Sequence, residues 1–166
     1  LAIGPHGGIV VDEHMRTNLV EVYAAGDIAE TRDLLTGDSY VHAIFPNAVA
    51  QGRVAGFNLA GLDVAYPGAE RFNSLKHLGL AVVAAGLKQG DEVLQERRGA
   101  NLRTLYLQEE RLVGFQLVGD TRAAGSLHSL MVNGSRVKAI KGRLLEAGFG
   151  AGMLAWQAVG NSLPAS

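Results

Sequence analysis

The pattern of apolar residues in the first 30 positions predicts two short β-strands. Residues 8–11, Gly-Ile-Val-Val, are apolar and β-branched, with glycines before them and acidic residues after them. Residues 20–25 form a second apolar run, which Gly26 and Asp27 end abruptly. The polar, turn-rich stretch from Glu30 to Tyr40 is typical of a loop. We therefore expect two strands joined by a turn, the second ending in Gly-Asp, and then a loop.

A helix is predicted after this loop. Pro46 suits the first turn of a helix, because its φ is fixed near the helical value and its missing N–H would have no partner there. Small or apolar residues then recur at helical spacing as far as Leu59, and Gly61 is a plausible C-terminal cap. A face of small side chains predicts that something packs closely against this helix. Residues 63–70, which contain Pro67-Gly68, are expected to be a linker.

The second half of the chain has the pattern of an antiparallel sheet with helices. Strands are predicted over residues 78–85, 92–97, 102–107 and 112–118. The last two flank a short turn at residues 108–111, which indicates a β-hairpin. Helical patterns follow over residues 123–132, 137–147 and, more weakly, 153–159. The fold class expected is α+β, with a small antiparallel sheet and helices against one of its faces.

Composition and charge exclude several classes of partner and of functional site. Hydrophobic residues make up 48% of the 166 positions and charged ones 19%, which is typical of a globular protein. Lys and Arg total 15 against 16 for Asp and Glu. Nucleic acids and membrane surfaces attract excess positive charge, so neither is expected as a partner. Cysteine is absent from the sequence, which excludes a thiolate metal site or a redox dithiol within it.

Other catalytic and metal-binding patterns in the sequence are weak. The five histidines include no pair at the i, i+4 spacing of a helical zinc motif, so no metal site is expected. Residues 126–129, Ser-Leu-His-Ser, lack the G-x-S-x-G turn of a hydrolase nucleophile. Residues 148–152, Gly-Phe-Gly-Ala-Gly, lack the strand before and the Lys-Ser/Thr after that a phosphate-binding loop requires. No catalytic residue is assigned within this chain.

The Gly26-Asp27 pair is the strongest candidate for a ligand site. Gly26 would let a ligand approach the backbone, and Asp27 offers a carboxylate acceptor to a hydroxyl group. The helix that begins at Pro46 would direct its N-terminal N–H groups and positive dipole end to the same place. The alternative is an ordinary turn in which Asp27 is a cap. The spacing of these residues alone does not decide between the two interpretations.

The segment around this pair resembles the second flavin-binding motif of the FAD-dependent pyridine nucleotide–disulfide oxidoreductases. That motif is written T-x-x-P-x-hydrophobic-Y/F-A-x-G-D, and the residues matching it are Thr17, Val22, Tyr23, Ala24, Gly26 and Asp27. Val20 stands where proline is usual. The resemblance implies that Asp27, with Ala25 and Gly26, binds the ribityl chain of FAD. It also implies that Ala43, Ile44 and Phe45 pass the pyrimidine edge of the isoalloxazine ring, and that the helix stabilises the reduced, anionic flavin.

The second half is similar to the C-terminal region of one subgroup, which contains NADH-dependent nitrite reductase, rubredoxin reductase and related NADH oxidases. The similarity rests on Leu75-Lys76 with the following apolar run, and on residues 112–121, which end in Gly-Asp-Thr. It implies that residues 1–65 are the closing segment of an FAD-binding α/β domain. Residues 70–166 would then be a C-terminal interface domain of the dimerisation type, so a homodimer is expected.

The function implied by this resemblance is that of part of an FAD-dependent NAD(P)H oxidoreductase of the cytoplasm. Hydride would pass from NAD(P)H, bound outside these residues, to FAD and then to an acceptor. Oxygen, a disulfide, rubredoxin and a nitrite-reducing centre stay open as acceptors. The chain begins without methionine, and we expect a truncated fragment that is inactive alone. The alternatives are a non-catalytic dimerisation or electron-partner docking module, and an unrelated α+β enzyme in which Gly26-Asp27 is only a turn.

Overall fold

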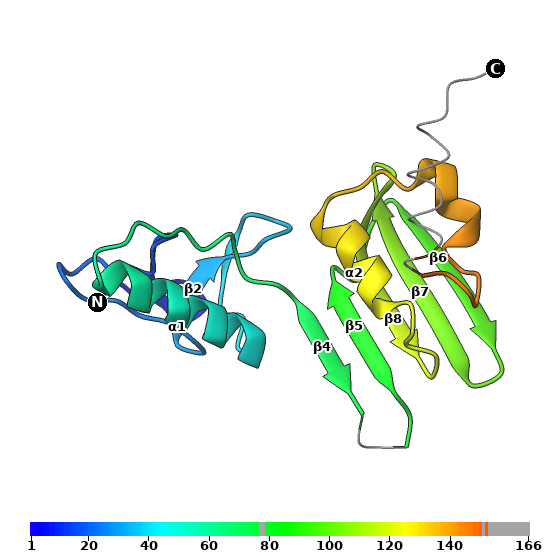
Figure 1. The fold of residues 1–166 in the computed structure, drawn as a ribbon, viewed down its shortest axis with the longest axis horizontal. Helices are drawn as coiled ribbons and strands as arrows, with labels where there is room; N and C mark the ends of the chain where they lie inside the picture. Colours follow the sequence, from blue (N-terminus) through cyan, green and yellow to red (C-terminus); the bar gives the residue numbers. More distant parts are fainter. Residues whose placement is uncertain (77–78, 151, 153–166) are drawn as a thin grey trace. The chain divides into compact units, whose positions relative to one another are not determined.

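The computed structural model describes residues 1–76, 79–150 and 152. The chain forms two compact units, Leu1–Arg71 and Phe72–Ser166. The fold is α+β, and the second unit contains a small antiparallel sheet with a helix packed against it (Figure 1). The helix predicted at residues 153–159 lies outside the described residues.

The first unit is built on a three-stranded sheet in the order β1-β2-β3. These strands are β1 (Ile9–Val10), β2 (Ala29–Arg32) and β3 (Ser39–Tyr40). β1 pairs with β2 in parallel, and β2 pairs with β3 antiparallel. The strand predicted near residue 9 is confirmed. The strand predicted at residues 20–25 is wrong, and the segment from Glu30 to Tyr40 is a β-hairpin and not the expected loop.

A closed turn explains why residues 20–25 do not join the sheet. The Thr17 N–H and hydroxyl both donate to the Val22 carbonyl oxygen at 2.9 Å, and the Leu19 N–H donates to the Thr17 hydroxyl at 3.1 Å. Glu21 has a positive φ of 64°, and Val20 is 90% exposed at the tip. Because the turn satisfies its own backbone groups, an apolar sequence here does not need strand partners.

Helix α1 (Phe45–Leu59) begins where Pro46 predicts, after the extended residue Ile44. Its buried face, however, is not the expected face of small residues. The buried residues include three amides and two small apolar side chains: Asn47, Gln51, Val54, Ala55 and Asn58. Val49 is exposed, and a Cβ at Gly52 or Gly56 would meet no atom of the described residues within 4 Å. Within the first unit, the helix is therefore held by amide hydrogen bonds as well as by apolar packing.

The segment expected as a linker, residues 63–70, packs back onto α1. The Asn58 side chain donates to the Val64 carbonyl oxygen at 2.8 Å and accepts the Val64 N–H at 3.0 Å. Tyr66 and Ala69 are buried in the same apolar cluster as Met15, Val54 and Ala55. The segment is thus an integral part of the first unit.

The second unit contains a five-stranded antiparallel sheet in the order β4-β5-β8-β7-β6 (Figure 1). Its strands are β4 (Phe72–Leu75), β5 (Val82–Gly86), β6 (Glu92–Arg98), β7 (Asn101–Gln108) and β8 (Arg111–Val118). Helix α2 (Ala124–Val132) packs against β8 and β5. The predicted hairpin and this helix are confirmed. The helix expected at residues 137–147 is a 3₁₀-helix, Lys138–Arg143.

The backbones of β5 and β8 leave no room for a side chain at Gly114, which pairs with Gly86. A Cβ at Gly114 would collide with the carbonyl oxygen of Leu87, just after β5. The Leu87 N–H donates to the Val113 carbonyl oxygen at 2.8 Å, which holds the two backbones together. Only glycine fits this position of β8.

The β7–β8 turn carries local backbone strain that a substitution should relieve. Glu109 and Glu110 have φ values of 48° and 62°, the conformation of a type I′ turn, which favours Asn-Gly. We expect Glu110→Gly to raise the free energy of unfolding by about 0.5–1 kcal/mol, because glycine adopts positive φ without a steric penalty. Thermal denaturation of the variant and the parent measures this change.

The control for this prediction is the exposed ion pair that the substitution also removes. Glu110 Oε1 lies 2.9 Å from Lys138 Nζ, and such surface pairs contribute less than about 1 kcal/mol. Lys138→Met removes the ion pair and leaves the turn unchanged. A lower melting temperature for Glu110→Gly than for Lys138→Met would show that the turn is not strained.

Candidate functional site

The Gly26-Asp27 turn lies against the first two turns of α1. The Gly26 N–H donates to Oε1 of Gln51 at 2.8 Å, and a Cβ at Gly26 would lie 3.6 Å from that of Ala48. Gly26 has a φ of 84°, which favours glycine. The turn precedes β2 and does not end a strand, which corrects the expected arrangement. The Asp27 side chain is exposed, so its carboxylate can accept hydrogen bonds from a ligand.

The second group of predicted site residues leads directly into α1. Ile44 is the N-cap and its side chain has no polar atom, and the first turn of α1 carries no acidic residue. The backbone N–H groups at this end are therefore available to an external acceptor. Ala43 is exposed, Ile44 is half-buried and Phe45 is 81% exposed. Both groups of residues, 25–27 and 43–45, thus border the N-terminal half of α1.

A buried carboxylate, Asp33, anchors the segment that precedes these residues. Its Oδ1 accepts the N–H groups of Leu35 and Thr36, both at 2.9 Å. Arg71 Nε donates to Oδ2 at 2.7 Å, and His42 Nε2 makes a close polar contact with the same oxygen at 2.8 Å. Asp33 is fully buried, and the side chain of His42 is only 7% exposed. The cluster fixes the chain at His42, one residue before the 43–45 segment.

Burial and charge move the pKa values of this cluster. Burial raises the pKa of Asp33, but the hydrogen bonds from Arg71 and the two N–H groups outweigh it, so the pKa is lowered. Burial lowers the pKa of His42, and the charge of Arg71 lowers it further, against the opposing effect of Asp33. Asp33 is therefore held as a carboxylate, and neutral His42 is favoured.

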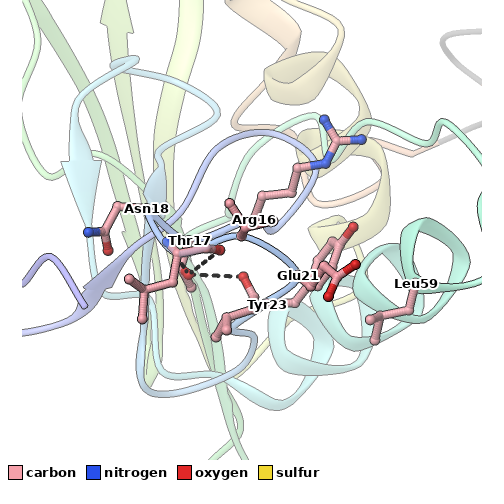
Figure 2. Close-up of a pocket in the computed structure, with 9 residues that line it drawn as sticks. Arg16, Thr17, Asn18, Glu21, Tyr23 and Leu59 are labelled. Carbon is pink, nitrogen blue, oxygen red and sulfur yellow. Dashed lines mark hydrogen bonds between the residues drawn. The ribbon is translucent and has the colours of Figure 1, made fainter.

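Two cavities are present elsewhere in the first unit. One, of about 550 Å³, is lined by residues 16–23 and Leu59. Figure 2 shows the side chains of Arg16, Glu21 and Tyr23 around it, with the Thr17 hydrogen bonds that close the turn. A second cavity, of about 450 Å³, is lined by segments around Asp12, Thr31 and Tyr66. Within the described part of the chain, neither cavity is lined by residues 25–27 or 43–45.

Sequence reasoning missed the amides of α1 and the Asp33 cluster. Asn47 and Gln51 stand one turn apart on the buried face of α1, and this i, i+4 amide pair is the signal that was available. In residues 1–76, 79–150 and 152, the structure contains no group of three His, Asp or Glu side chains placed to hold a metal ion. The helices in the same residues are too short or too polar to cross a membrane.

The N-terminal part of the chain matches a known protein family. Residues 1–52 match the sequence profile of the family described as pyridine nucleotide-disulphide oxidoreductase. The chain is a relative of these oxidoreductases. It is 34% identical over 106 residues to the NAD(P)H sulfur oxidoreductase (CoA-dependent) of Pyrococcus furiosus. The aligned residues cover 64% of this chain and 23% of that protein. The chain is also 30% identical over 146 residues to subunit epsilon of the NADH-dependent phenylglyoxylate dehydrogenase of Aromatoleum evansii. The aligned residues cover 83% of this chain and 34% of that subunit.

Solved structures of pyridine nucleotide-dependent oxidoreductases share the fold. The NAD-dependent persulfide reductase of A. fulgidus has a TM-score of 0.66 at 25% identity, covering 99% of this chain and 31% of that one. The water-forming NADH oxidase of Lactobacillus brevis, solved bound to NADH, has a TM-score of 0.70 at 23% identity, covering 84% and 36%. The chain spans about a quarter to a third of the length of the curated relatives described above. These relatives are enzymes that use NAD(P)H.

Proposed function

We propose that this chain is the C-terminal part of an FAD-dependent NAD(P)H oxidoreductase. Residues 1–65 would close the FAD-binding domain, and residues 70–166 would form its interface domain. The observation that carries this proposal is the contact between the Gly26-Asp27 turn and the start of α1, made by the 2.8 Å hydrogen bond from Gly26 to Gln51. This contact holds the residue before the exposed Asp27 against the N-terminal half of the helix whose first turn is uncapped.

The donor and acceptor groups at this end of α1 fit the chemistry of FAD. The Asp27 carboxylate would accept hydrogen bonds from the ribityl hydroxyls, and Gly26 has no side chain to keep the ligand from the backbone. The N–H groups at residues 45 and 47 would donate to a ring carbonyl oxygen, where the helix dipole favours negative charge. FAD, when bound, supplies the hydride acceptor and electron carrier. The residues of this chain bind, orient and polarise it.

The distribution of exposed apolar side chains supports an FAD-binding domain that further protein would cover. In the described residues, thirteen of the exposed large hydrophobic residues lie in the first unit and four in the second. Ile28, Phe45 and Val49 are among the thirteen and lie near the proposed flavin site. Extensive exposed apolar surface is typical of a face that binds protein or ligand.

The sheet of the second unit supports an interface role, which is also the alternative, non-catalytic function. Opposite residues in register place Leu75, Val82, Val118 and Leu102 in one row across the sheet. All four are partly or largely exposed, whereas Val83 and Leu117 in the next row are buried. We propose that this apolar row contributes to a homodimer. Nitrite-reducing centres, oxygen, disulfides and proteins such as rubredoxin stay open as electron acceptors, and the cytoplasmic location stays a prediction.

Loss of the Asp27 carboxylate tests the proposed flavin site. In the full-length protein, Asp27→Asn is expected to weaken FAD binding about 10- to 100-fold, because it removes a charge-assisted hydrogen bond to a ribityl hydroxyl. The measurement is a fluorescence titration of the apoprotein with FAD. The control is Asp63→Asn, which changes another exposed carboxylate of the first unit, 85% exposed, located after α1. Unchanged FAD binding by Asp27→Asn would refute the assignment.

A further inference from the structure

We propose that Gln51 is a positioning residue of the flavin site, which sets the place of Asp27 by holding the Gly26 N–H. This inference rests on the proposed function. Gln51 is only 1% exposed, and its Oε1 accepts the Gly26 N–H at 2.8 Å from a position 25 residues away in the sequence. The bonded nitrogen belongs to the residue immediately before Asp27. The amide therefore fixes the backbone from which the carboxylate extends.

The Tyr66 phenol belongs to the polar surroundings of the Gln51 amide. Burial raises the pKa of this phenol, while its interaction with Gln51 acts to lower it. The Tyr66 hydroxyl donates to Oδ1 of Asn47 at 3.4 Å. Gln51, Asn47 and Tyr66 are all buried. The amide that accepts the Gly26 N–H therefore lies in a buried polar environment.

A second buried amide of α1, Asn47, contacts the other half of the site. Asn47 Nδ2 donates to the His42 carbonyl oxygen at 3.4 Å and to the Glu70 carbonyl oxygen at 2.9 Å. Asn47 therefore contacts the segment that continues into Ala43 and Ile44, one helical turn before Gln51 contacts Gly26. Buried polar groups are costly to leave unpaired, so a network of this kind has one favoured arrangement. Its arrangement sets the spacing between the ribityl-binding and ring-binding halves of the site.

If Gln51 had only a structural role, its replacement would affect stability and not FAD affinity specifically. A second amide of α1 serves as a matched control. Asn58 is a buried amide on the same face of the same helix. Its Nδ2 donates to the carbonyl oxygens of His14 and Val64, and it has no described hydrogen bond to Gly26 or Asp27. If Gln51 only stabilises the fold, replacing it should affect FAD binding no more than replacing Asn58.

The test is a double-mutant cycle on FAD affinity in the full-length protein. Gln51→Met keeps the length of the side chain and removes the hydrogen bond to the Gly26 N–H. We expect it to weaken FAD binding about tenfold when Asp27 is present, and less than about twofold in the Asp27→Asn background, because the bond to Gly26 acts through Asp27. Asn58→Leu should lower the melting temperature of the apoprotein and leave FAD affinity within about twofold.

Each outcome of this cycle decides one of the two proposals. Equal weakening by Gln51→Met in both backgrounds would overturn the positioning role, while the proposed function would stand if Asp27→Asn alone weakens binding. No effect of Asp27→Asn alone would overturn the proposed function itself. If Gln51→Met does not fold, Gln51→Asn keeps a polar amide and, being one methylene shorter, withdraws its oxygen from the Gly26 N–H. It should weaken FAD binding in the same Asp27-dependent way, and additive behaviour would overturn the inference.

Discussion

Replacing Phe115 by alanine is expected to lower the free energy of unfolding of the second unit by about 3–5 kcal/mol. Phe115 is fully buried on β8, opposite Leu105 of β7 and Ala85 of β5, which are themselves buried. Alanine would leave a cavity on the face of the sheet that α2 covers, and the neighbours in the sheet are held by backbone pairing and cannot collapse into it. Urea denaturation measures the loss, with hydrogen exchange of β7 and β8 assigning it to this unit.

The control for Phe115 is an apolar residue on the same sheet that is not buried. Val93 of β6 is 53% exposed. Val93→Ala should cost less than about 1 kcal/mol, because little buried apolar surface is lost and the whole scale of strand propensities spans only about 1 kcal/mol. A loss for Phe115→Ala no larger than that for Val93→Ala would mean that the core of the second unit is not packed around Phe115.

Replacing Asp33 by alanine is expected to lower the stability of the first unit by about 3 kcal/mol near neutral pH. The substitution leaves Arg71 and two backbone N–H groups without their acceptor, inside a cluster where Asp33 is fully buried. The pKa of Asp33 is lowered in the folded protein. Its contribution is therefore present above the ordinary pKa of about 4 and is lost as the pH falls through the lowered value. The difference between the variant and the parent should shrink correspondingly in acid.

Asp38→Ala is the matched control for Asp33, because Asp38 is an exposed carboxylate in the same β2–β3 hairpin. It should change stability by less than about 0.5 kcal/mol. The measurement is hydrogen exchange of β2 and α1 at pH 7 and at about pH 2, well below the ordinary pKa of a carboxyl group. A destabilisation by Asp33→Ala that stays the same at both values would contradict the role of the charged carboxylate.

Local signals in the sequence predict the elements whose ends depend on near neighbours. Pro46 marks the start of α1, and the four residues 108–111 mark the β7–β8 turn. The apolar run at residues 20–25 predicts a strand but forms a turn, because Thr17 satisfies the backbone of that segment. Conversely, β2 reads as polar, Ala-Glu-Thr-Arg, yet its Glu30 is buried where the carboxylate accepts the N–H groups of His6 and Gly8.

The residues of the candidate site also fall into two groups, those marked by local sequence and those placed by distant partners. Asp27 and the 43–45 segment can be predicted from the sequence because a contiguous motif and a helix start mark them. Gln51 and Asp33 cannot, because their partners, Gly26 and Arg71, lie 25 and 38 residues away. The i, i+4 spacing of Asn47 and Gln51 marks a shared face of α1, but nothing within a short window of sequence shows which distant backbone N–H such an amide holds. The supports of the site are visible only in three dimensions.

The close approach of β5 and β8 limits how the sequence of this unit can diverge. Buried apolar positions such as Phe115 and Leu117 can exchange with other apolar residues when their neighbours repack. Gly114 has no such freedom, because even a single methyl group there would collide with the backbone oxygen of Leu87, which cannot move without breaking the pairing of the two strands. The position of β8 that has no side chain is therefore the one with the fewest acceptable substitutions.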